Sequence, residues 1–204
     1  MNEELKNILE RVNCLYQKYG IKSVTMDDVA RELGISKKTL YNHVKDKTEL
    51  VTMAVDIEMA SKETCFRDIF NKNLNAIDEL LEINRFVNDM VKEYNPSREY
   101  DLRKYYPELY AKIRDINMNR MYEAARDNII KGKKEGLYRN ELDETLIAKL
   151  HVARIIGMHE NPMMTLEEYT SLKTFMEIIT YHIRGIANER GIQYFERKIK
   201  NQEI

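Results

Sequence analysis

Residues 20–50 read GIKSVTMDDVARELGISKKTLYNHVKDKTEL, and the cap and turn residues of this stretch decide the fold. Thr25 stands three residues before an aspartate, which is the spacing of a capping box. A helix is therefore expected to begin after Thr25 and to end at Gly34. Ser36 has the position of a second helix cap, and this second helix is expected to continue to about Val44. Two short helices around a glycine turn are the parts of a helix-turn-helix.

The apolar residues of this stretch have the spacing that lets two helices pack against each other. The first helix has one apolar face with a small alanine, which allows a close approach of the second helix. The apolar residues are Val29, Ala30 and Leu33 on the first helix and Ile35, Leu40 and Val44 on the facing side. The pattern predicts a packed pair of helices.

The positions between the apolar residues of the second helix carry hydrogen-bond donors, and none of them is acidic. They are Lys37, Lys38, Thr39, Tyr41, Asn42 and His43. The two lysines stand in the first turn, where a cation costs about 0.3–1 kcal/mol against the helix dipole. A helix from Ser36 to Val44 is about 12 Å long, which fits the DNA major groove, about 12 Å wide. The negative charge of DNA would outweigh the local cost, so the pattern predicts a DNA recognition helix.

Residues 20–50 resemble the DNA-binding domain of TetR-type bacterial transcriptional regulators. The resemblance is carried, in this order, by the first glycine, the capping threonine, Val-Ala, Gly-Ile-Ser, Thr-Leu-Tyr and Lys-x-x-Leu. Two positions depart from the family pattern: Val44 replaces an aromatic core residue, and His43 stands where the family often has tyrosine. The resemblance implies a sequence-specific repressor that binds a two-fold symmetric operator as a homodimer and is released by a small-molecule effector.

Residue by residue, the resemblance also implies a set of DNA contacts. Thr25 is expected to contact a phosphate, and Lys47, at the start of the next helix, is expected to bind another phosphate beside the helix amides. Lys37, Lys38 and Thr39 are expected to face the groove. The full DNA-binding set is Thr25, Ser36, Lys37, Lys38, Thr39, Tyr41, Asn42, His43 and Lys47.

The composition independently favours an all-α fold. The 204 residues include 43% hydrophobic and 33% charged residues, but only 7 glycines and 3 prolines. The resemblance implies a three-helix DNA-binding domain over residues 1–47. It also implies a larger helical domain for effector binding and dimerisation over residues 48–204.

No apolar run of the sequence approaches the roughly 20 residues that a membrane span requires, so a soluble, cytoplasmic protein is expected. The net charge of -1 indicates no partner by itself, because a basic patch can be balanced by acidic residues elsewhere. Cys14 and Cys65 stand far apart without a metal-ligand pattern. Neither a metal nor a cofactor is expected.

Helical spacing predicts further helices on both sides of the recognition motif. The expected ranges are about 2–19 before it, a helix starting at Asp46 directly after it, and then 74–93, 98–105, 107–135, 142–158, 166–188 and 191–200. Turns are expected at prolines and glycines, including Asn161-Pro162.

Two of the later helices carry apolar residues on more than one face, in residues 146–158 and 169–186. Burial on two sides is most simply achieved by the chain's own domain and by a second subunit. The expected interface residues are Leu150, Ile155, Leu172, Phe175, Met176, Ile179 and Ile183. A central helix of a monomer is the alternative.

The resemblance places an effector pocket among the middle helices. Aromatic and methionine side chains of that region could line it, and as individual residues they could equally be ordinary core. They are Phe66, Phe86, Met90, Tyr94, Tyr105, Tyr106, Tyr110, Met118, Met121 and Tyr122.

Two other functions are weighed against a ligand-released repressor. The same fold could act by recruiting a protein partner or by constitutive repression, without a small molecule. A helical-bundle enzyme is the second alternative, but no Glu-x-x-His pattern, glycine-rich phosphate loop or nucleophile motif occurs in the sequence. The sequence contains no recognisable catalytic motif, so a DNA-binding regulator is the preferred interpretation.

Overall fold

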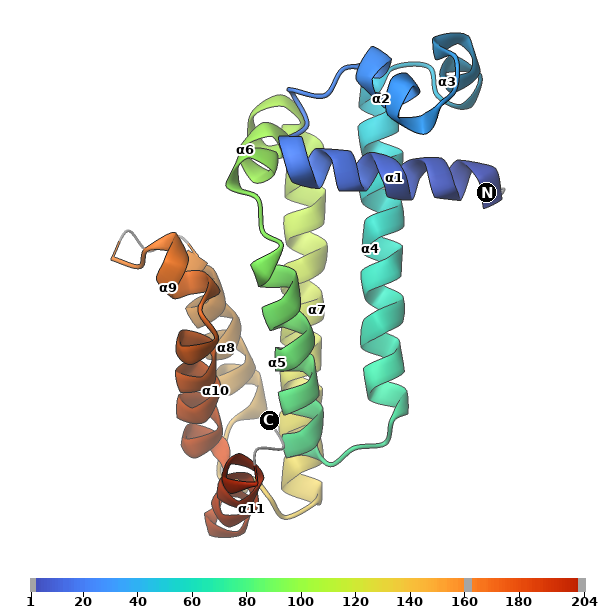
Figure 1. The fold of residues 1–204 in the computed structure, drawn as a ribbon. Coiled ribbons are helices and arrows are strands. Elements are labelled where there is room, and N and C mark those ends of the chain that lie inside the picture. The colour runs from blue at the N-terminus through green and yellow to red at the C-terminus, as the bar shows by residue number, and fades with distance from the viewer. Residues whose placement is uncertain (1–2, 160–162, 202–204) are drawn as a thin grey trace. The chain divides into compact units, whose positions relative to one another are not determined.

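The computed structural model describes residues 3–159 and 163–201, and these residues are helical almost throughout (Figure 1). The helices are α1 (Glu3–Tyr19), α2 (Met26–Leu33), α3 (Lys37–His43), α4 (Lys47–Asn71), α5 (Ala76–Lys92), α6 (Pro96–Tyr105), α7 (Pro107–Lys134), α8 (Glu144–His159), α9 (Leu166–Thr170), α10 (Leu172–Ile186) and α11 (Glu189–Lys200). The only extended pairing in the described ranges is an isolated bridge between Tyr138 and Ala187. The all-α fold is confirmed. The turn expected at Asn161-Pro162 lies outside the described residues.

The caps predicted around the recognition motif are present. The Thr25 hydroxyl accepts a hydrogen bond from the backbone N–H of Asp28 at 3.1 Å, and the Asp28 carboxylate accepts one from the Thr25 N–H at 2.9 Å. Gly34 ends α2 with a φ of 70°, in the left-handed region where glycine avoids a steric penalty. The Ser36 hydroxyl accepts from the Thr39 N–H at 3.0 Å and begins α3. Local side-chain chemistry thus fixes both helices of the motif.

One predicted helix is divided. The range 166–188 was expected to be continuous, but the backbone at Ser171 is extended, with a ψ of 136°. Ser171 ends α9 and begins α10, because its hydroxyl accepts a hydrogen bond from the Thr174 N–H at 3.1 Å. Asn188 interrupts the chain again, since its side chain caps α11 through the Gly191 N–H at 3.0 Å. The break at Asn188 agrees with the separate helices expected over 166–188 and 191–200, whereas the continuous apolar period hides the cap at Ser171.

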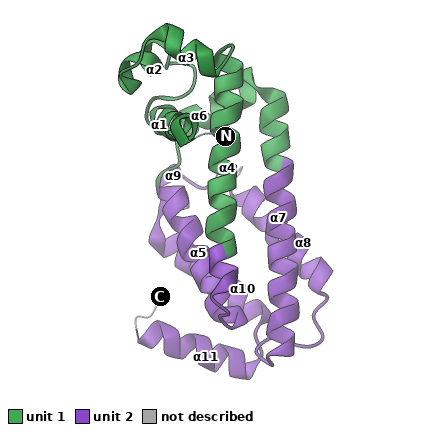
Figure 2. Cartoon of the chain, turned by 90° about the vertical axis from the view of Figure 1, so that its right-hand side faces the viewer, with its two compact units in different colours: residues 1–67, 93–114 green, residues 68–92, 115–204 purple. Residues whose placement is uncertain are grey.

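The packing divides the chain into two compact units (Figure 2). The first contains residues 1–67 and 93–114, and the second contains residues 68–92 and 115–204. The expected boundary between residues 47 and 48 marks the start of α4, and the packing continues past it. The reason is that Leu50 in α4 and Leu102 in α6 belong to the same core as α1 and α2. The domain assignment by function therefore remains a prediction.

The core of the first unit joins α1, α2, α3, α4 and α6. Leu9, Leu40 and Leu50 are completely buried there. Val44, which replaces an aromatic residue of the family pattern, is also buried, at 2% exposure. Despite its smaller side chain, Val44 fills a core position beside the recognition helix.

The core of the second unit joins α5, α10 and α11. Ile77, Ile183 and Phe195 are completely buried in it, and Tyr138 from the segment after α7 packs beside them. The Tyr138 hydroxyl donates to the side-chain oxygen of Asn128 at 3.0 Å, so this buried phenol is satisfied. Among the described helices, none combines the length and the apolar character needed to cross a membrane.

Candidate nucleic-acid interface

The outer surface of α3 presents polar side chains that make no hydrogen bonds of their own. Lys38, Tyr41 and Asn42 are exposed, and Tyr41 retains 42% of its accessible surface. Across residues 3–159 and 163–201, their side chains form neither a hydrogen bond nor an ion pair. Leu40 and Val44 on the opposite side of the helix are buried, which fixes the orientation of this polar face. The face can therefore donate several hydrogen bonds to a ligand without breaking bonds within the protein.

Lys37 differs from its neighbour Lys38. Its ammonium donates to the Asp27 carboxylate of α2 at 3.0 Å. This hydrogen bond and the charge of Asp27 raise the pKa of Lys37 above its usual value. Lys37 is thus held toward α2, whereas Lys38 is the first-turn cation that remains available. Sequence reasoning missed the role of Asp27, although an acidic residue in the first turn of α2 was visible.

Two predicted contacts are partly engaged by the protein itself. The Ser36 and Thr39 hydroxyls lie 2.7 Å apart and share a hydrogen bond. Only part of their hydrogen-bonding capacity is therefore available to a ligand. The His43 side chain is 18% exposed, and its Nε2 lies 4.0 Å from a carboxylate oxygen of Glu4 in α1. His43 sits at the edge of the polar face of α3, between that face and the start of α1.

Lys47 is turned toward the loop between α1 and α2. Its ammonium donates to the carbonyl of Ile21 at 2.7 Å and to that of Lys22 at 3.3 Å. Burial lowers the pKa of Lys47, and this effect outweighs the opposite influence of Asp101 and Asp28. Lys47 therefore holds the loop that leads into α2, and through that loop it positions the Thr25 cap. A contact with phosphate would have to use its remaining donor.

The same loop carries an exposed cation that sequence reasoning missed. Lys22 donates to the Tyr105 hydroxyl at 2.6 Å and lies 4.7 Å from the centre of that ring. The backbone N–H of Lys22 donates to the buried Asp101 carboxylate at 2.7 Å. Helix α6 thus fixes both the backbone and the side chain of Lys22. Its position three residues before the Thr25 cap was the signal in the sequence.

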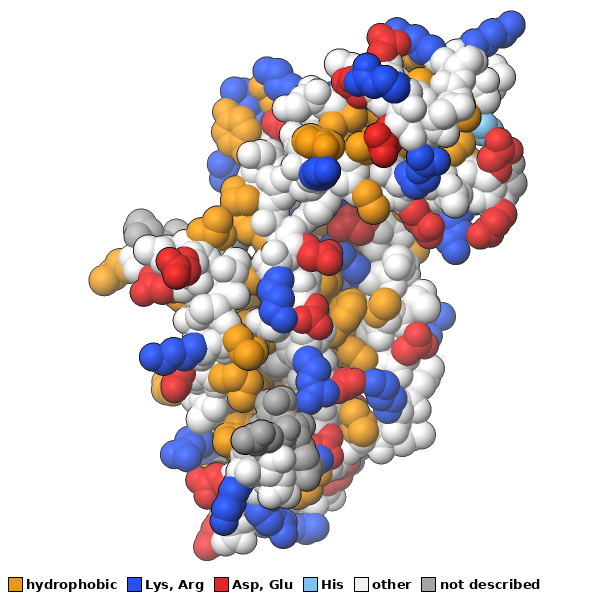
Figure 3. All heavy atoms as spheres, viewed as in Figure 1, with side chains coloured by type: hydrophobic (Ala, Val, Ile, Leu, Met, Phe, Trp, Pro, Cys, Tyr) orange, Lys and Arg blue, Asp and Glu red, His pale blue; other side chains and the backbone are white. Residues whose placement is uncertain are grey.

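Figure 3 shows that acidic and basic side chains lie interspersed over the face that it draws. This agrees with the net charge of -1 for the whole chain. A nucleic-acid interface in this protein has to be found from the placement of individual residues, since no overall excess of positive charge marks it.

The placement of caps, glycine turn and polar face agrees with a family comparison. Residues 8–53 match the family model described as bacterial regulatory proteins, tetR family. Residues 8–53 are thus similar to the DNA-binding domain of the tetR family of bacterial regulatory proteins.

Two relatives support the assignment. An uncharacterized HTH-type transcriptional regulator of Bacillus subtilis, YvaF, is 23% identical over 183 residues, which cover 89% of this chain and 95% of that protein. An HTH-type transcriptional regulator of Staphylococcus aureus is 33% identical over 67 residues, which cover 33% of this chain and 36% of that protein. The first match shows that similarity continues beyond the recognition motif.

Solved structures share the fold over nearly the whole chain. A transcriptional regulator from Cytophaga hutchinsonii aligns with a TM-score of 0.76 at 16% identity and covers 92% of this chain and 100% of its own. AibR, solved with isovaleryl coenzyme A and operator DNA, aligns with a TM-score of 0.58 at 16% identity and covers 88% of this chain and 97% of its own. The likeness to these two structures therefore extends beyond residues 8–53 and shows a shared fold.

The residues expected at a dimer interface fall into two groups. Leu150 on α8 and Leu172 on α10 are 56% and 59% exposed. Ile179 and Ile183 are 2% and 0% exposed and lie in the core of their own unit, so they offer no surface to a second subunit. Met176 packs partly buried against that core, and the remaining two, Ile155 and Phe175, are half-buried.

An exposed apolar face nevertheless exists on α8 and α10. Leu146, four residues before Leu150, is 52% exposed, and Tyr181 is 76% exposed. The two helices lie together, because the rings of His151 and His182 are 4.4 Å apart. We call Leu146, Leu150 and Tyr181 the α8–α10 face; Leu172 stands nine residues before Tyr181, on the other side of α10, and is not part of it. The spacing of the two leucines on α8 was a signal that sequence reasoning did not use.

The ten residues expected to line an effector pocket are divided between the units. Phe66, Tyr94, Tyr105, Tyr106 and Tyr110 belong to the first, and Phe86, Met90, Met118, Met121 and Tyr122 to the second. Tyr106 and Tyr110 pack against the core of the first unit, and Tyr105 is engaged by Lys22. The Tyr94 and Tyr110 hydroxyls donate to the Glu99 carboxylate at 2.7 and 3.0 Å. Tyr94, Tyr105, Tyr106 and Tyr110 therefore pack against the core of the first unit or form hydrogen bonds within it.

Proposed function

We propose that this chain is a TetR-type regulator that represses transcription by binding a two-fold symmetric operator as a homodimer, and that a small-molecule effector releases it. The observation that carries the proposal is the exposed polar face of α3. Lys38, Tyr41 and Asn42 are held outward by a buried opposite side, and they can meet base edges and phosphates in the major groove.

The roles of the other DNA-binding residues follow from their contacts. Thr25 and Ser36 shape the helix starts, and their backbone amides and hydroxyls would approach the phosphates on either side of the groove. Lys47 contributes mainly by holding the loop before α2. Lys37 would exchange its contact with Asp27 for a contact with DNA, so its net contribution to affinity should be smaller than that of Lys38.

The α8–α10 face supports the homodimer. Its side chains are more than half exposed, and burying them would remove apolar surface from water at roughly 25 cal/mol per Å². A second copy of the same face is the simplest complement, because symmetric dimers use one patch twice. Such a dimer would place two recognition helices about 34–36 Å apart, which is one turn of DNA.

The effector part of the proposal rests on likeness to other regulators. AibR was solved with isovaleryl coenzyme A and operator DNA, so a protein of this fold accommodates both kinds of ligand. An effector releases the operator only if it binds the DNA-incompetent state more tightly than the DNA-competent one.

Selection of bound duplexes from a random DNA pool tests the proposed function. The wild-type chain should enrich a sequence with approximate two-fold symmetry. Lys38→Gln should change the preferred bases within each half-site, whereas Lys45→Gln, which removes an exposed lysine beyond the end of α3, should keep the same sequence. Failure of the wild-type chain to enrich any sequence would contradict operator recognition.

A further inference from the structure

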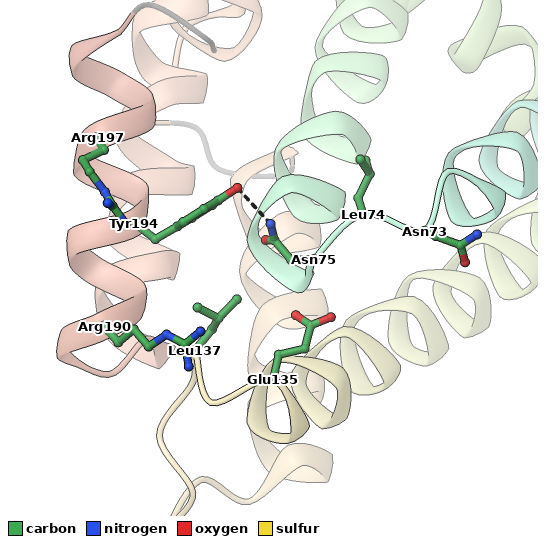
Figure 4. A pocket seen from close by; sticks show the side chains of 8 residues that line it. All are labelled: Asn73, Leu74, Asn75, Glu135, Leu137, Arg190, Tyr194 and Arg197. Carbon is green, nitrogen blue, oxygen red and sulfur yellow. Dashed lines mark hydrogen bonds between the residues drawn. The ribbon is translucent and has the colours of Figure 1, made fainter.

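The second unit contains a cavity of about 470 Å³ that none of the predicted pocket residues lines. Its walls come from three places in that unit: the loop before α5, the segment after α7 and one side of α11 (Figure 4). The lining residues are Asn73, Leu74, Asn75, Glu135, Leu137, Arg190, Tyr194 and Arg197. The volume is within the range of small-molecule sites.

Two guanidinium groups in this cavity have no anionic partner among the residues that the structure describes. Arg190 and Arg197 flank Tyr194 on the same side of α11, and Figure 4 shows the three side chains on one wall. Neither arginine forms a hydrogen bond or an ion pair with another side chain in the described part of the chain. By contrast, Arg184 in the same unit lies 3.1 Å from the Glu196 carboxylate. The two cavity arginines are therefore available to an anion.

The carboxylate in the cavity wall is already engaged. One oxygen of Glu135 accepts a hydrogen bond from the Ala76 N–H at 2.7 Å, in the first turn of α5. A carboxylate at this end of a helix is stabilised by the exposed N–H groups and by the helix dipole. The nearby Asp78 carboxylate lies 3.4 Å from the Lys198 ammonium. Asp78 thus has a cationic partner and Glu135 is held by the start of α5, whereas neither arginine pairs with a carboxylate of residues 3–159 or 163–201.

The opposite wall is apolar or amide in character, and it is held in place. Asn75 donates to the Tyr194 hydroxyl at 2.9 Å, which connects the loop before α5 to α11. Asn73 has a φ of 50°, a left-handed conformation that is uncommon outside glycine and is tolerated best by asparagine and aspartate. Sparsely populated backbone conformations of this kind concentrate at binding sites. Leu137 and the Tyr194 ring offer apolar surface on the side of the two arginines, and Leu74 offers apolar surface across the cavity from them (Figure 4).

We infer that this cavity binds a small organic acid with two carboxylates joined by an apolar chain. The arginines are seven residues apart on α11, about 10 Å along the helix axis, so they suit two separated anionic groups better than one. Each guanidinium can bind one carboxylate through two parallel hydrogen bonds. The chain between them would lie against Leu137 and the Tyr194 ring. This inference concerns a site outside the predicted effector pocket and does not require DNA binding.

Isothermal titration of the full-length chain with succinate, adipate, suberate and sebacate tests the inference. An intermediate or long diacid should bind more tightly than succinate, and octanoate should bind about tenfold or more weakly than suberate because it loses one charged hydrogen-bonded pair. Arg190→Gln and Arg197→Gln should each weaken suberate binding by about tenfold or more. Arg184→Gln is the matched control, because it removes the same charge from an exposed pair.

Several results would overturn the inference. They are the absence of suberate binding at millimolar concentration, equal binding of octanoate and suberate, and equal effects of the cavity variants and Arg184→Gln. Far-UV circular dichroism establishes that each variant retains its helices, so a loss of binding reports on the cavity. Because the assay contains no DNA, failure of this inference and failure of the proposed repressor function are separate outcomes.

Discussion

The polar face of α3 and the α8–α10 face expose opposite kinds of side chain. On α3 the apolar Leu40 is completely buried, and the exposed residues are donors such as Lys38. On α8 and α10 the exposed residues include the apolar Leu150 and the aromatic Tyr181, while His151 and His182 are half-buried. The difference indicates two kinds of partner: an anionic, hydrogen-bonding surface for α3 and another apolar protein surface for α8 and α10.

Partly buried arginines show a related contrast between the units. In the first, Arg98 donates to both carboxylate oxygens of Glu58, so this partly buried cation has its counter-charge. In the second, Arg154 lies 3.2 Å from the His151 ring and weakly contacts the carbonyl of Ile178. No carboxylate of the described residues pairs with Arg154. The arginine of the first unit therefore has a carboxylate partner, whereas Arg154, four residues after Leu150 on α8, has none among the described residues.

The largest expected effect is the loss of the dimer when the α8–α10 face becomes charged. Leu150→Glu buries a carboxylate in both copies of the interface, and a cost of about 4 kcal/mol is expected from about 2 kcal/mol at each site. Sedimentation velocity at micromolar concentration should then report a monomer. Ile199→Glu, which charges an exposed apolar residue on α11, is the control and should stay dimeric. A dimeric Leu150→Glu variant would refute the role of this face.

The second effect is a loss of stability when Arg98, which is paired with Glu58, is replaced. Arg98→Met leaves the Glu58 carboxylate, whose side chain is 23% exposed, with Lys62 as its remaining partner. Removing one member of a buried pair costs about 3 kcal/mol, so the first unit should lose about that much unfolding free energy in urea, followed by circular dichroism. Lys112→Met breaks an exposed pair with Asp56 and should cost less than about 1 kcal/mol. Equal losses of unfolding free energy in the two variants would show that the Arg98–Glu58 pair stabilises the protein no more than the exposed Lys112–Asp56 pair does.

The third effect is a loss of stability in acid. Burial lowers the pKa of His182 to about 3 and that of His151 to about 4, and the nearby charge of Arg154 acts in the same direction. Both imidazoles are neutral in the folded protein, and below about pH 6.5 they take up protons when the protein unfolds. The free energy of unfolding should therefore decrease as the pH is lowered below about 6.5. His182 alone should account for about 2 kcal/mol by pH 5. His182→Gln should flatten the pH dependence of urea unfolding; an unchanged slope would contradict this assignment.

The smallest effect separates the two adjacent lysines of α3. Lys38→Gln should weaken operator binding by about 1 kcal/mol, the lower end for a contact to a base edge. Lys37→Gln should cost less, because the wild-type lysine first has to leave Asp27. Fluorescence anisotropy with a labelled operator duplex measures both. A larger loss for Lys37 than for Lys38 would reverse the roles that the structure suggests.

The helix-turn-helix could be predicted almost completely from the sequence because its determinants are local. Thr25, Gly34 and Ser36 each act within a few residues of their position, and a cap or a left-handed turn has a recognisable spacing. The direction of the Lys37 and Lys47 side chains could not be predicted. Their partners, Asp27 and the carbonyl of Ile21, are brought close only when α2, α3 and α4 pack together.

The larger helices were harder to interpret because an apolar period identifies a helix without saying what each side contacts. Ile179 and Tyr181 are two residues apart, yet Ile179 is 2% exposed and Tyr181 is 76% exposed. The break at Ser171 was hidden for a similar reason, since the apolar period continues on both sides of it. The cavity with Arg190 and Arg197 joins segments far apart in the chain, and no local motif marks it.

The central claim is that two copies of the α3 face read DNA together, and the spacing of half-sites tests it most directly. Binding is measured by anisotropy for duplexes that carry the selected symmetric sequence, and for the same duplexes with five extra base pairs between the half-sites. Two chains should bind the first duplex tightly. Affinity for the second duplex should fall by about 100-fold or more, because half a turn of DNA moves one half-site to the opposite side. Equal affinity for both duplexes would contradict the central claim.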